Sequence, residues 1–382
     1  MRRKNPSRSK GALGAYLAVA LGWGALLLRW LGQWSRIPPG AAASLGGTFL
    51  AFAMVAVLIT LLSLVAAKQA DRLAEVLGEP YGTLVLTLSV ALIEVALISA
   101  VMLGPGDHVT IARDSIMSVS MIILNLVIGL ALLVSGAKRN PSGNRRAPCA
   151  NQTGVRKYLA LLALSVLLVF GLPNLLGDGG QFPRGLALPA AALVALSYAW
   201  FLYRQMGSSR CDYQEVHPLE NPTSVGWGSS VKGGALKTSV LLVLLLVPIV
   251  LLADSMADLM DHTFLDLGAP PALAGLVIAS IVFFPETISS VRAASTGRMQ
   301  RVSNLCHGAL LSTMGITIPA VLLIGAIGTT PVVLAETSAN LGFLAATLAL
   351  TWFSFARGRT VSWLGAAHLV LFACYIAVLL AA

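Results

Sequence analysis

The 382-residue sequence contains little charge and few cysteines. Charged residues make up 11% of the chain, hydrophobic residues make up 57%, and the mean hydropathy is +0.81. A water-soluble domain of this size cannot bury so much apolar surface, so this composition excludes a soluble protein. The four cysteines lie far apart without CxxC spacing, which argues against a disulfide framework or a zinc site.

Several motifs of energy-coupled or catalytic membrane proteins are also missing. The sequence has no Walker-type nucleotide-binding loop, so we do not expect an ATP-driven pump, and it has no HExxH or comparable intramembrane catalytic pattern. The aspartates of DSMADLMD, residues 254–261, leave a Mg²⁺-dependent membrane-embedded enzyme as an alternative, although no second acidic motif faces them. A proton-coupled carrier of organic solutes is a third possibility.

Apolar runs of about 20 residues recur along the whole chain, and each is long enough to cross the roughly 30 Å hydrocarbon layer as a helix. We therefore predict an all-α polytopic membrane protein in contact with the lipid bilayer. The run after MRRKNPSRSK exceeds the apolar length of a signal peptide, so we expect an uncleaved first helix. The eleven predicted spans lie near residues 11–31, 43–67, 80–103, 114–136, 157–177, 186–206, 235–253, 271–292, 303–328, 331–354 and 361–381.

The lysines and arginines indicate the orientation of these spans. If the N-terminus is cytoplasmic, only four of the 26 basic residues, Arg29, Arg36, Arg113 and Arg184, fall outside, as the positive-inside rule requires. The formal charge of +10 then reflects topology and not a nucleic-acid partner. We expect a bacterial inner-membrane protein with a cytoplasmic N-terminus and an external C-terminus.

The spans divide into an extra first helix and two halves of five helices. We predict a basic N-terminus and first helix at 1–42, a first repeat at 43–206, a cytoplasmic linker at 207–234 and a second repeat at 235–382. Because a five-helix unit repeated in tandem must insert upside down the second time, the repeats should be inverted. LGEPYG before the third span and LGAPPALAG before the eighth support this internal similarity.

Each half carries one lone acid in its second helix, Glu94 in the third span and Glu286 in the eighth. A carboxylate in mid-membrane costs roughly 2.5–3.5 kcal/mol, so both should face the bundle and not lipid. The preceding Pro285 frees a backbone carbonyl four residues earlier, adding an oxygen near Glu286. The hydroxyls that can add further oxygens, or else only pack helices together, are those of Thr83, Thr87, Ser89, Thr287, Ser289 and Ser290.

Two carboxylates surrounded by oxygen ligands suit a hard cation such as Ca²⁺. Without the metal, two negative charges would lie close together in a medium of low polarity, which favours their protonation. Metal and protons therefore compete for Glu94 and Glu286, and this competition is the physical basis of antiport. We expect a secondary transporter and not an enzyme, with no cofactor. The transported ions are Ca²⁺ and H⁺, and Na⁺ or K⁺ is the alternative to Ca²⁺.

The segments LGEPYGTLVLTLSVALIEVALISA, FPETISS and SFARGRTVSWLGAAHLVLFACYIA resemble the bacterial ChaA-type antiporters of the calcium/cation antiporter superfamily. The resemblance covers most of the chain from the third span onward. It implies two inverted five-helix repeats after an extra helix, with Glu94 and Glu286 as the exchanging residues. It also implies that the opposite wall of the site is lined by Asn125, Gly308, Ser312 and Thr313.

The sequence departs from the GNxxE pattern of vacuolar calcium exchangers, since Val90-Ala91 and Phe283-Phe284 replace Gly-Asn. Fewer amide oxygens leave the ion open, and ChaA-type members are associated with Ca²⁺/H⁺ and with Na⁺/H⁺ or K⁺/H⁺ exchange.

Other polar residues have possible accessory roles. Glu336, placed one turn into the tenth span, could assist proton or ion entry, and His307 and His368 could relay protons or simply bond helices together. The aspartates between Asp254 and Asp266 are expected in a solvated external loop without a basic partner.

Overall fold

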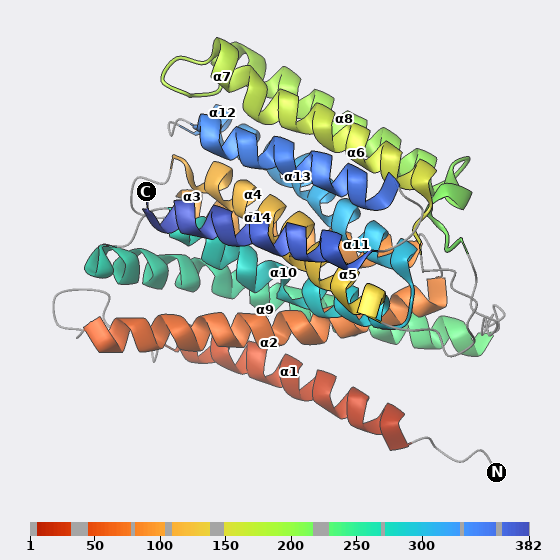
Figure 1. Ribbon diagram of the computed structural model, residues 1–382. Coiled ribbons are helices and arrows are strands. Elements are labelled where there is room, and N and C mark those ends of the chain that lie inside the picture. Colours follow the sequence, from red (N-terminus) through yellow and green to blue (C-terminus); the bar gives the residue numbers. More distant parts are fainter. Residues whose placement is uncertain are drawn as a thin grey trace.

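The computed structural model describes residues 6–31, 45–77, 81–103, 109–137, 149–216, 229–268, 272–328, 332–356 and 361–381. Its long helices run roughly parallel or antiparallel to one another (Figure 1). Within the described residues, ten apolar segments are long enough to cross a membrane, and the third helix adds a shorter apolar run, Thr87–Leu103. These eleven helical crossings confirm the predicted polytopic all-α fold.

The helices follow the predicted order. They are α1 (Pro6–Trp30), α2 (Leu45–Leu77), α3 (Tyr81–Leu103), α4 (Ile111–Met121), η1 (Ile122–Val127), α5 (Ile128–Ala137), α6 (Gln152–Val166), η2 (Leu167–Gly171), α7 (Leu172–Leu176), α8 (Arg184–Met206), η3 (Arg210–Tyr213), α9 (Ser229–Leu267), α10 (Ala272–Ser295), α11 (Met299–Ser312), η4 (Thr313–Thr317), α12 (Ile318–Ile327), α13 (Ser338–Ala356) and α14 (Ser362–Ala381). The centres of the two repeated motifs, residues 78–80 and 269–271, lie outside the described residues.

Some predicted ends were wrong, because polar residues continue a helix beyond its apolar part. α2 ends at Leu77 and not near 67, and α9 spans Ser229–Leu267 and not 235–253. The run beginning at Asp254 is therefore helical and not a loop. Asp254 also has a basic partner, since it pairs with Arg29 of α1. In contrast, α13 begins at Ser338, so Glu336 precedes the helix.

Three crossings contain a π-helical turn. η1 joins α4 to α5, η4 joins α11 to α12, and η2 joins α6 to α7. η1 and η4 occupy the same place in the two halves, within the third helix of each. Because π turns inside α-helices are rare and frequent at functional sites, this matched pair directs attention to the residues beside it.

The two halves exchange contacts reciprocally. α3 packs against α11 and η4, whereas α10 packs against α4, η1 and α5. In the same way α5 packs against α14, and α12 packs against α8. The first helices of the halves, α2 and α9, share an extensive interface, and α1 lies against them at one edge of the bundle (Figure 1).

Glycines allow several of these helices to approach closely. A Cβ atom on Gly365 would lie 2.6 Å from the carbonyl oxygen of Gly129, and one on Gly315 would lie 2.4 Å from the ring of Tyr198. Small residues drive helix packing in membranes because backbones can then come into contact. The α5–α14 and α8–η4 interfaces therefore depend on the absence of a side chain.

We expect Gly365→Ala to destabilise the bundle, because the added methyl group would overlap with the Gly129 carbonyl and with the backbone nitrogen of Leu133, 2.9 Å away. Overpacking of this kind costs about 1–3 kcal/mol. The melting temperature of the detergent-solubilised protein should fall. Gly24→Ala is the matched control, since a Cβ there meets nothing within 4 Å. Equal melting temperatures for the two variants would contradict the close α5–α14 contact.

Candidate functional site

The two lone acids lie inside the bundle. Glu94 of α3 is 0% exposed, and Glu286 of α10 is 3% exposed. The two helices pack against each other, and the two carboxyl groups are close enough to interact electrostatically. Both side chains therefore face protein and not the lipid-facing surface.

The Glu94 carboxyl lies against the π turn η4. Thr313 Oγ1 donates a hydrogen bond to Glu94 Oε2 at 2.6 Å. Thr317 faces the same carboxyl, but its buried hydroxyl has no hydrogen bond of normal geometry. Glu94 Oε1 also has no partner among the described residues. One carboxylate oxygen and one hydroxyl oxygen are thus available to a ligand.

Glu286 has even fewer partners. Both of its carboxylate oxygens are buried without a hydrogen bond to any described residue, and Pro285 beside it is also buried. Asp71 of α2 and Glu94 are the charged groups that act on it. Buried polar atoms in folded proteins are nearly always satisfied, so a carboxylate with two free oxygens requires an explanation such as a bound cation or a proton.

Four of the predicted lining hydroxyls bond to their own helices. Thr287 Oγ1 donates to the Phe283 carbonyl at 2.9 Å, and Ser312 Oγ donates to the Ala309 carbonyl at 2.7 Å. Thr87 and Ser89 make the same kind of bond within α3. Such bonds to the preceding turn are the usual use of Ser and Thr in helices.

The remaining predicted lining residues differ in what they contact. Ser290 Oγ accepts from Cys306 Sγ at 3.7 Å, and Gly308 lies beside Thr87 and Tyr158. The side chain of Thr83 lies outside the described residues. Among the described members of the predicted set, Thr313 is the one whose hydroxyl reaches a glutamate.

Asn125 joins helices instead of contacting either glutamate. Its amide nitrogen donates to Thr347 Oγ1 at 2.8 Å, and its carbonyl oxygen lies 3.1 Å from His368 Nδ1. His368 Nε2 in turn lies 3.1 Å from Ser354 Oγ. This chain of hydrogen bonds connects η1 with α13 and α14, so Asn125 and His368 belong to one polar network.

His307 lies in a second polar region. Its Nδ1 atom contacts Ser303, its ring stacks on Tyr158, and its buried Nε2 atom has no partner in the described structure. A cavity of about 10 Å³ nearby is lined by residues including Tyr158, Asn304 and Gly308. That volume is about what one water molecule needs.

Sequence reasoning missed an ion pair near Glu286. Arg301 Nη2 lies 2.7 Å from Asp71 Oδ1, and Ser289 Oγ donates to Asp71 Oδ2 at 3.3 Å. These contacts join α2, α10 and α11 and occupy Ser289, which was predicted to line the ion site. Asp71 was overlooked because it lies between Lys68 and Arg72 at the end of an apolar run, where a solvated helix end is the ordinary interpretation.

The linker also contacts the second half. The Glu215 carboxylate accepts from the backbone nitrogens of Gln300 at 3.3 Å and Arg301 at 3.0 Å, in the first turn of α11. A carboxylate satisfies the free N–H groups at such a helix start. The described part of the linker therefore holds the beginning of α11.

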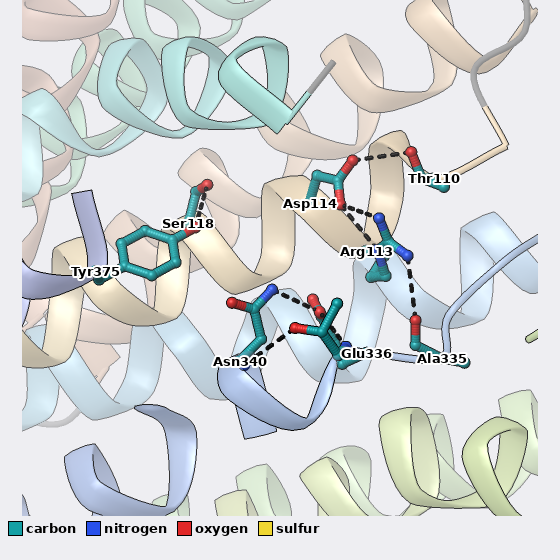
Figure 2. Close-up of polar contacts among 9 residues, drawn as sticks. Thr110, Arg113, Asp114, Ser118, Ala335, Glu336, Asn340 and Tyr375 are labelled. Atoms are coloured by element: carbon teal, nitrogen blue, oxygen red, sulfur yellow. Dashed lines mark hydrogen bonds and ion pairs between the residues drawn. The ribbon is translucent and has the colours of Figure 1, made fainter. Parts of the chain in front are cut away.

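Glu336 belongs to a separate cluster where α4 and α13 begin (Figure 2). Its carboxyl contacts Asn340, and Arg113 and Asp114 lie nearby. None of its described hydrogen bonds involves Glu94 or Glu286.

Comparison with known proteins gives consistent matches. The family described as sodium/calcium exchanger protein matches residues 47–207 and 237–381. The sodium-potassium/proton antiporter ChaA of Escherichia coli (strain K12) is 30% identical over 325 residues, covering 85% of this chain and 86% of ChaA. The putative ionic transporter y4hA of Sinorhizobium fredii is 32% identical over 311 residues, covering 80% of this chain and 82% of y4hA.

Solved structures share the fold. Native YfkE superposes with a TM-score of 0.70 at 16% identity, covering 96% of this chain and all of YfkE (100%). The H⁺/Ca²⁺ exchanger CAX gives a TM-score of 0.68 at 15% identity, covering 96% of this chain and 88% of CAX. These matches bear out the polytopic exchanger fold expected from the sequence.

The Asp71–Arg301 pair predicts a difference in stability between two Asp→Asn variants. The Asp71 and Arg301 side chains are 21% and 18% exposed, whereas Asp254 and Arg29 are 58% and 34% exposed. Asp71→Asn should lower the free energy of unfolding by about 1–3 kcal/mol, because it leaves a half-buried guanidinium without its charge partner. Asp254→Asn should cost less than about 1 kcal/mol. Melting temperatures in detergent measure both, and an equal decrease would contradict a special role for the Asp71 pair.

Proposed function

The chain belongs to the sodium/calcium exchanger protein family, and from this premise we propose that it exchanges cytoplasmic Ca²⁺ for external H⁺ through Glu94 and Glu286. The chain is a membrane transporter of small cations. The observation that carries the proposal is the pair of buried carboxyl groups on adjacent helices, in which Glu94 Oε1 and both oxygens of Glu286 have no hydrogen-bond partner among the described residues.

Competition between cation and proton follows from this environment. Two ionised carboxylates in an interior of low polarity repel each other and have lost their hydration. A divalent cation between them supplies the opposite charge, and protons remove the charge altogether. The site therefore switches from one side of the membrane to the other only when it holds the cation or protons, because the empty charged site is costly. This requirement couples the cation flux to the proton flux.

The reciprocal packing supports an alternating-access arrangement built from inverted repeats. Glu94 of α3 lies against η4, and the helix of Glu286, α10, packs against η1. In transporters with inverted repeats the ion site lies between the repeats near the middle of the bilayer. A π turn beside each acid-bearing helix provides backbone that can change its hydrogen bonding as the site opens to one side or the other.

A monovalent cation is the second candidate for the same site, because ChaA, named a sodium-potassium/proton antiporter, is 30% identical to this chain. The donors can serve either ion. Ca²⁺ takes six to eight oxygens, so it needs the two carboxylates and also hydroxyl, carbonyl or water oxygens. Na⁺ or K⁺ would leave one net negative charge on the pair, and one retained proton would neutralise it.

We expect Glu94→Gln and Glu286→Gln to abolish exchange, because an amide can neither carry the proton nor balance the metal charge. Proton movement in everted vesicles should be followed after adding Ca²⁺, Na⁺ or K⁺ separately. The response to the physiological cation should fall by more than about tenfold, as expected when more than 1.4 kcal/mol of binding free energy is lost. Asp254→Asn, with its acid paired at the bundle edge, is the control and should retain transport.

The alternatives give different outcomes in this assay. Cation-driven proton movement that survives in either glutamine variant would refute the site assignment. Proton flux that requires an organic solute and no metal would indicate a solute carrier. Loss of a Mg²⁺-dependent reaction in Asp254→Asn, with no ion flux in the wild type, would indicate a membrane-embedded enzyme.

The proposed orientation predicts which thiols a membrane-impermeant reagent reaches. Cys211, at the start of the linker, is exposed and should react in everted vesicles but not in intact cells. A cysteine introduced at the exposed Leu267, at the end of α9, should react in intact cells. Both experiments use a background in which Cys149 and Cys374 are replaced by serine. The reverse pattern would overturn a cytoplasmic linker and N-terminus.

A further inference from the structure

The segment before α13 is held tightly at the end of the bundle where α4 begins. The backbone nitrogen of Val333 donates to the Val109 carbonyl at 3.0 Å, and that of Ala335 donates to the Gly180 carbonyl at 3.2 Å. The segment therefore bridges the chain before α4 and the turn before α8. These contacts fix the position of the next residue, Glu336.

Glu336 is a buried acid that uses only one of its two carboxylate oxygens. The residue is 4% exposed. Oε2 accepts from Asn340 Nδ2 at 2.7 Å and from the Thr337 backbone nitrogen at 3.2 Å, whereas Oε1 has no partner among the described residues (Figure 2). A proton can therefore be added at Oε1 without breaking either hydrogen bond.

The neighbouring charges are already committed to each other. Arg113 lies 2.8 Å from Asp114, which also accepts from Thr110 at 2.8 Å, and Arg113 Nη1 donates to the Ala335 carbonyl at 3.2 Å. Figure 2 shows this pair above Glu336, with no hydrogen bond from Arg113 to the Glu336 carboxyl. The cluster of Arg113, Asp114 and Glu336 thus has one negative charge more than its arginine balances.

Three described groups from the packed elements act on or face this carboxyl. They are Arg113 and Asp114 of α4 and the phenol of Tyr375 of α14, which bonds Ser118 at 3.2 Å. Burial is the largest influence and raises the pKa of Glu336 to about 7, with Asn340 and Arg113 acting in the opposite direction and Asp114 adding to the rise. The carboxyl is therefore partly protonated at neutral pH.

We propose that Glu336 is a second proton-binding site, loaded at Oε1 from the end of the bundle where α4 and α13 begin, and distinct from Glu94 and Glu286. Ionised, the cluster with Arg113 and Asp114 carries one net negative charge, and protonated it carries none. The negative form attracts cations to the end of the bundle where α4 and α13 begin. Acid on that side of the membrane therefore slows cation uptake from the same side. This effect on transport rests on the proposed exchange function, whereas the binding of the proton does not.

Infrared difference titration tests the proton site directly. Wild type and Glu336→Gln are compared in liposomes between about pH 5 and pH 9, and we expect a protonated-carboxyl band that titrates near pH 7 and is missing from the variant. Glutamine retains an oxygen for Asn340 and Thr337, so the local fold should survive. Repeating the comparison in a Glu94→Gln background gives the same answer whether or not the chain is an exchanger.

Substitutions of two neighbouring acids test the direction in which the Glu336 titration midpoint moves. Asp114→Asn removes a negative neighbour and releases Arg113, so the midpoint of the Glu336 band should move to lower pH. Asp178→Asn, an exposed acid in the adjacent turn, should leave the midpoint unchanged. Absence of a Glu336-dependent band between about pH 6 and pH 8, or an upward shift in Asp114→Asn, would overturn the proton site.

Transport measurements test whether the charge on Glu336 controls cation uptake. In vesicles with the opposite pH held constant, cation uptake from the α13 side should rise with pH in both wild type and Glu336→Gln, because protons also compete with the cation at Glu94 and Glu286. Between about pH 6 and pH 8 the rise in wild type should exceed the rise in Glu336→Gln on the order of twofold to fivefold, as expected for one added charge at residue 336. Asp178→Asn should follow wild type. Equal rises in wild type and Glu336→Gln would refute control of uptake by this residue. No uptake in wild type would instead refute the exchange function and leave the infrared result standing.

Discussion

The cost of placing carboxylates in an apolar interior dominates this structure. Glu94 and Glu286 are buried among helices that contribute mostly apolar side chains, and three of their four carboxylate oxygens lack a partner among the described residues. An ionised acid in such a place is unstable unless a cation or a proton removes its charge. The described residues thus leave carboxylate oxygens without the hydrogen bonds that buried polar atoms normally make, at a place where a mobile cation or proton can bind.

The surrounding packing keeps other polar groups from completing the site. Thr87, Ser89, Thr287 and Ser312 use their hydroxyls on their own helices, and Ser289 is bound to Asp71. Such groups stabilise the helices without neutralising the glutamates. Only at η4, where the helix widens into a π turn, does a described hydroxyl reach one of the two carboxylates.

The sequence predicted the membrane-spanning helices well, because the hydrophobic thickness of a membrane sets a minimum helix length that the apolar runs reveal directly. It also singled out Glu94 and Glu286, since an ionisable residue inside such a run is rare. It could not predict hydroxyl orientation, because the χ1 rotamer of Thr287 decides whether its hydroxyl bonds to a neighbouring group or to the Phe283 carbonyl of its own helix. Asp71 and Arg301 are 230 residues apart, and no local pattern joins them. Glu336 was noticed, but its burial depends on chain segments from four different places.

The arrangement separates two kinds of acid by their neighbours. Glu286 interacts with Asp71 and Glu94, so charge there is determined by repulsion and by what occupies the pair. Glu336 instead lies beside an arginine already bound to Asp114 and keeps two hydrogen bonds on one oxygen. A proton at Glu336 therefore changes the charge of the cluster by one while leaving its hydrogen bonds intact. The same residue type can thus serve exchange in the centre of the bundle and proton sensing at its end, because the partners and not the carboxyl decide which ligand is favoured.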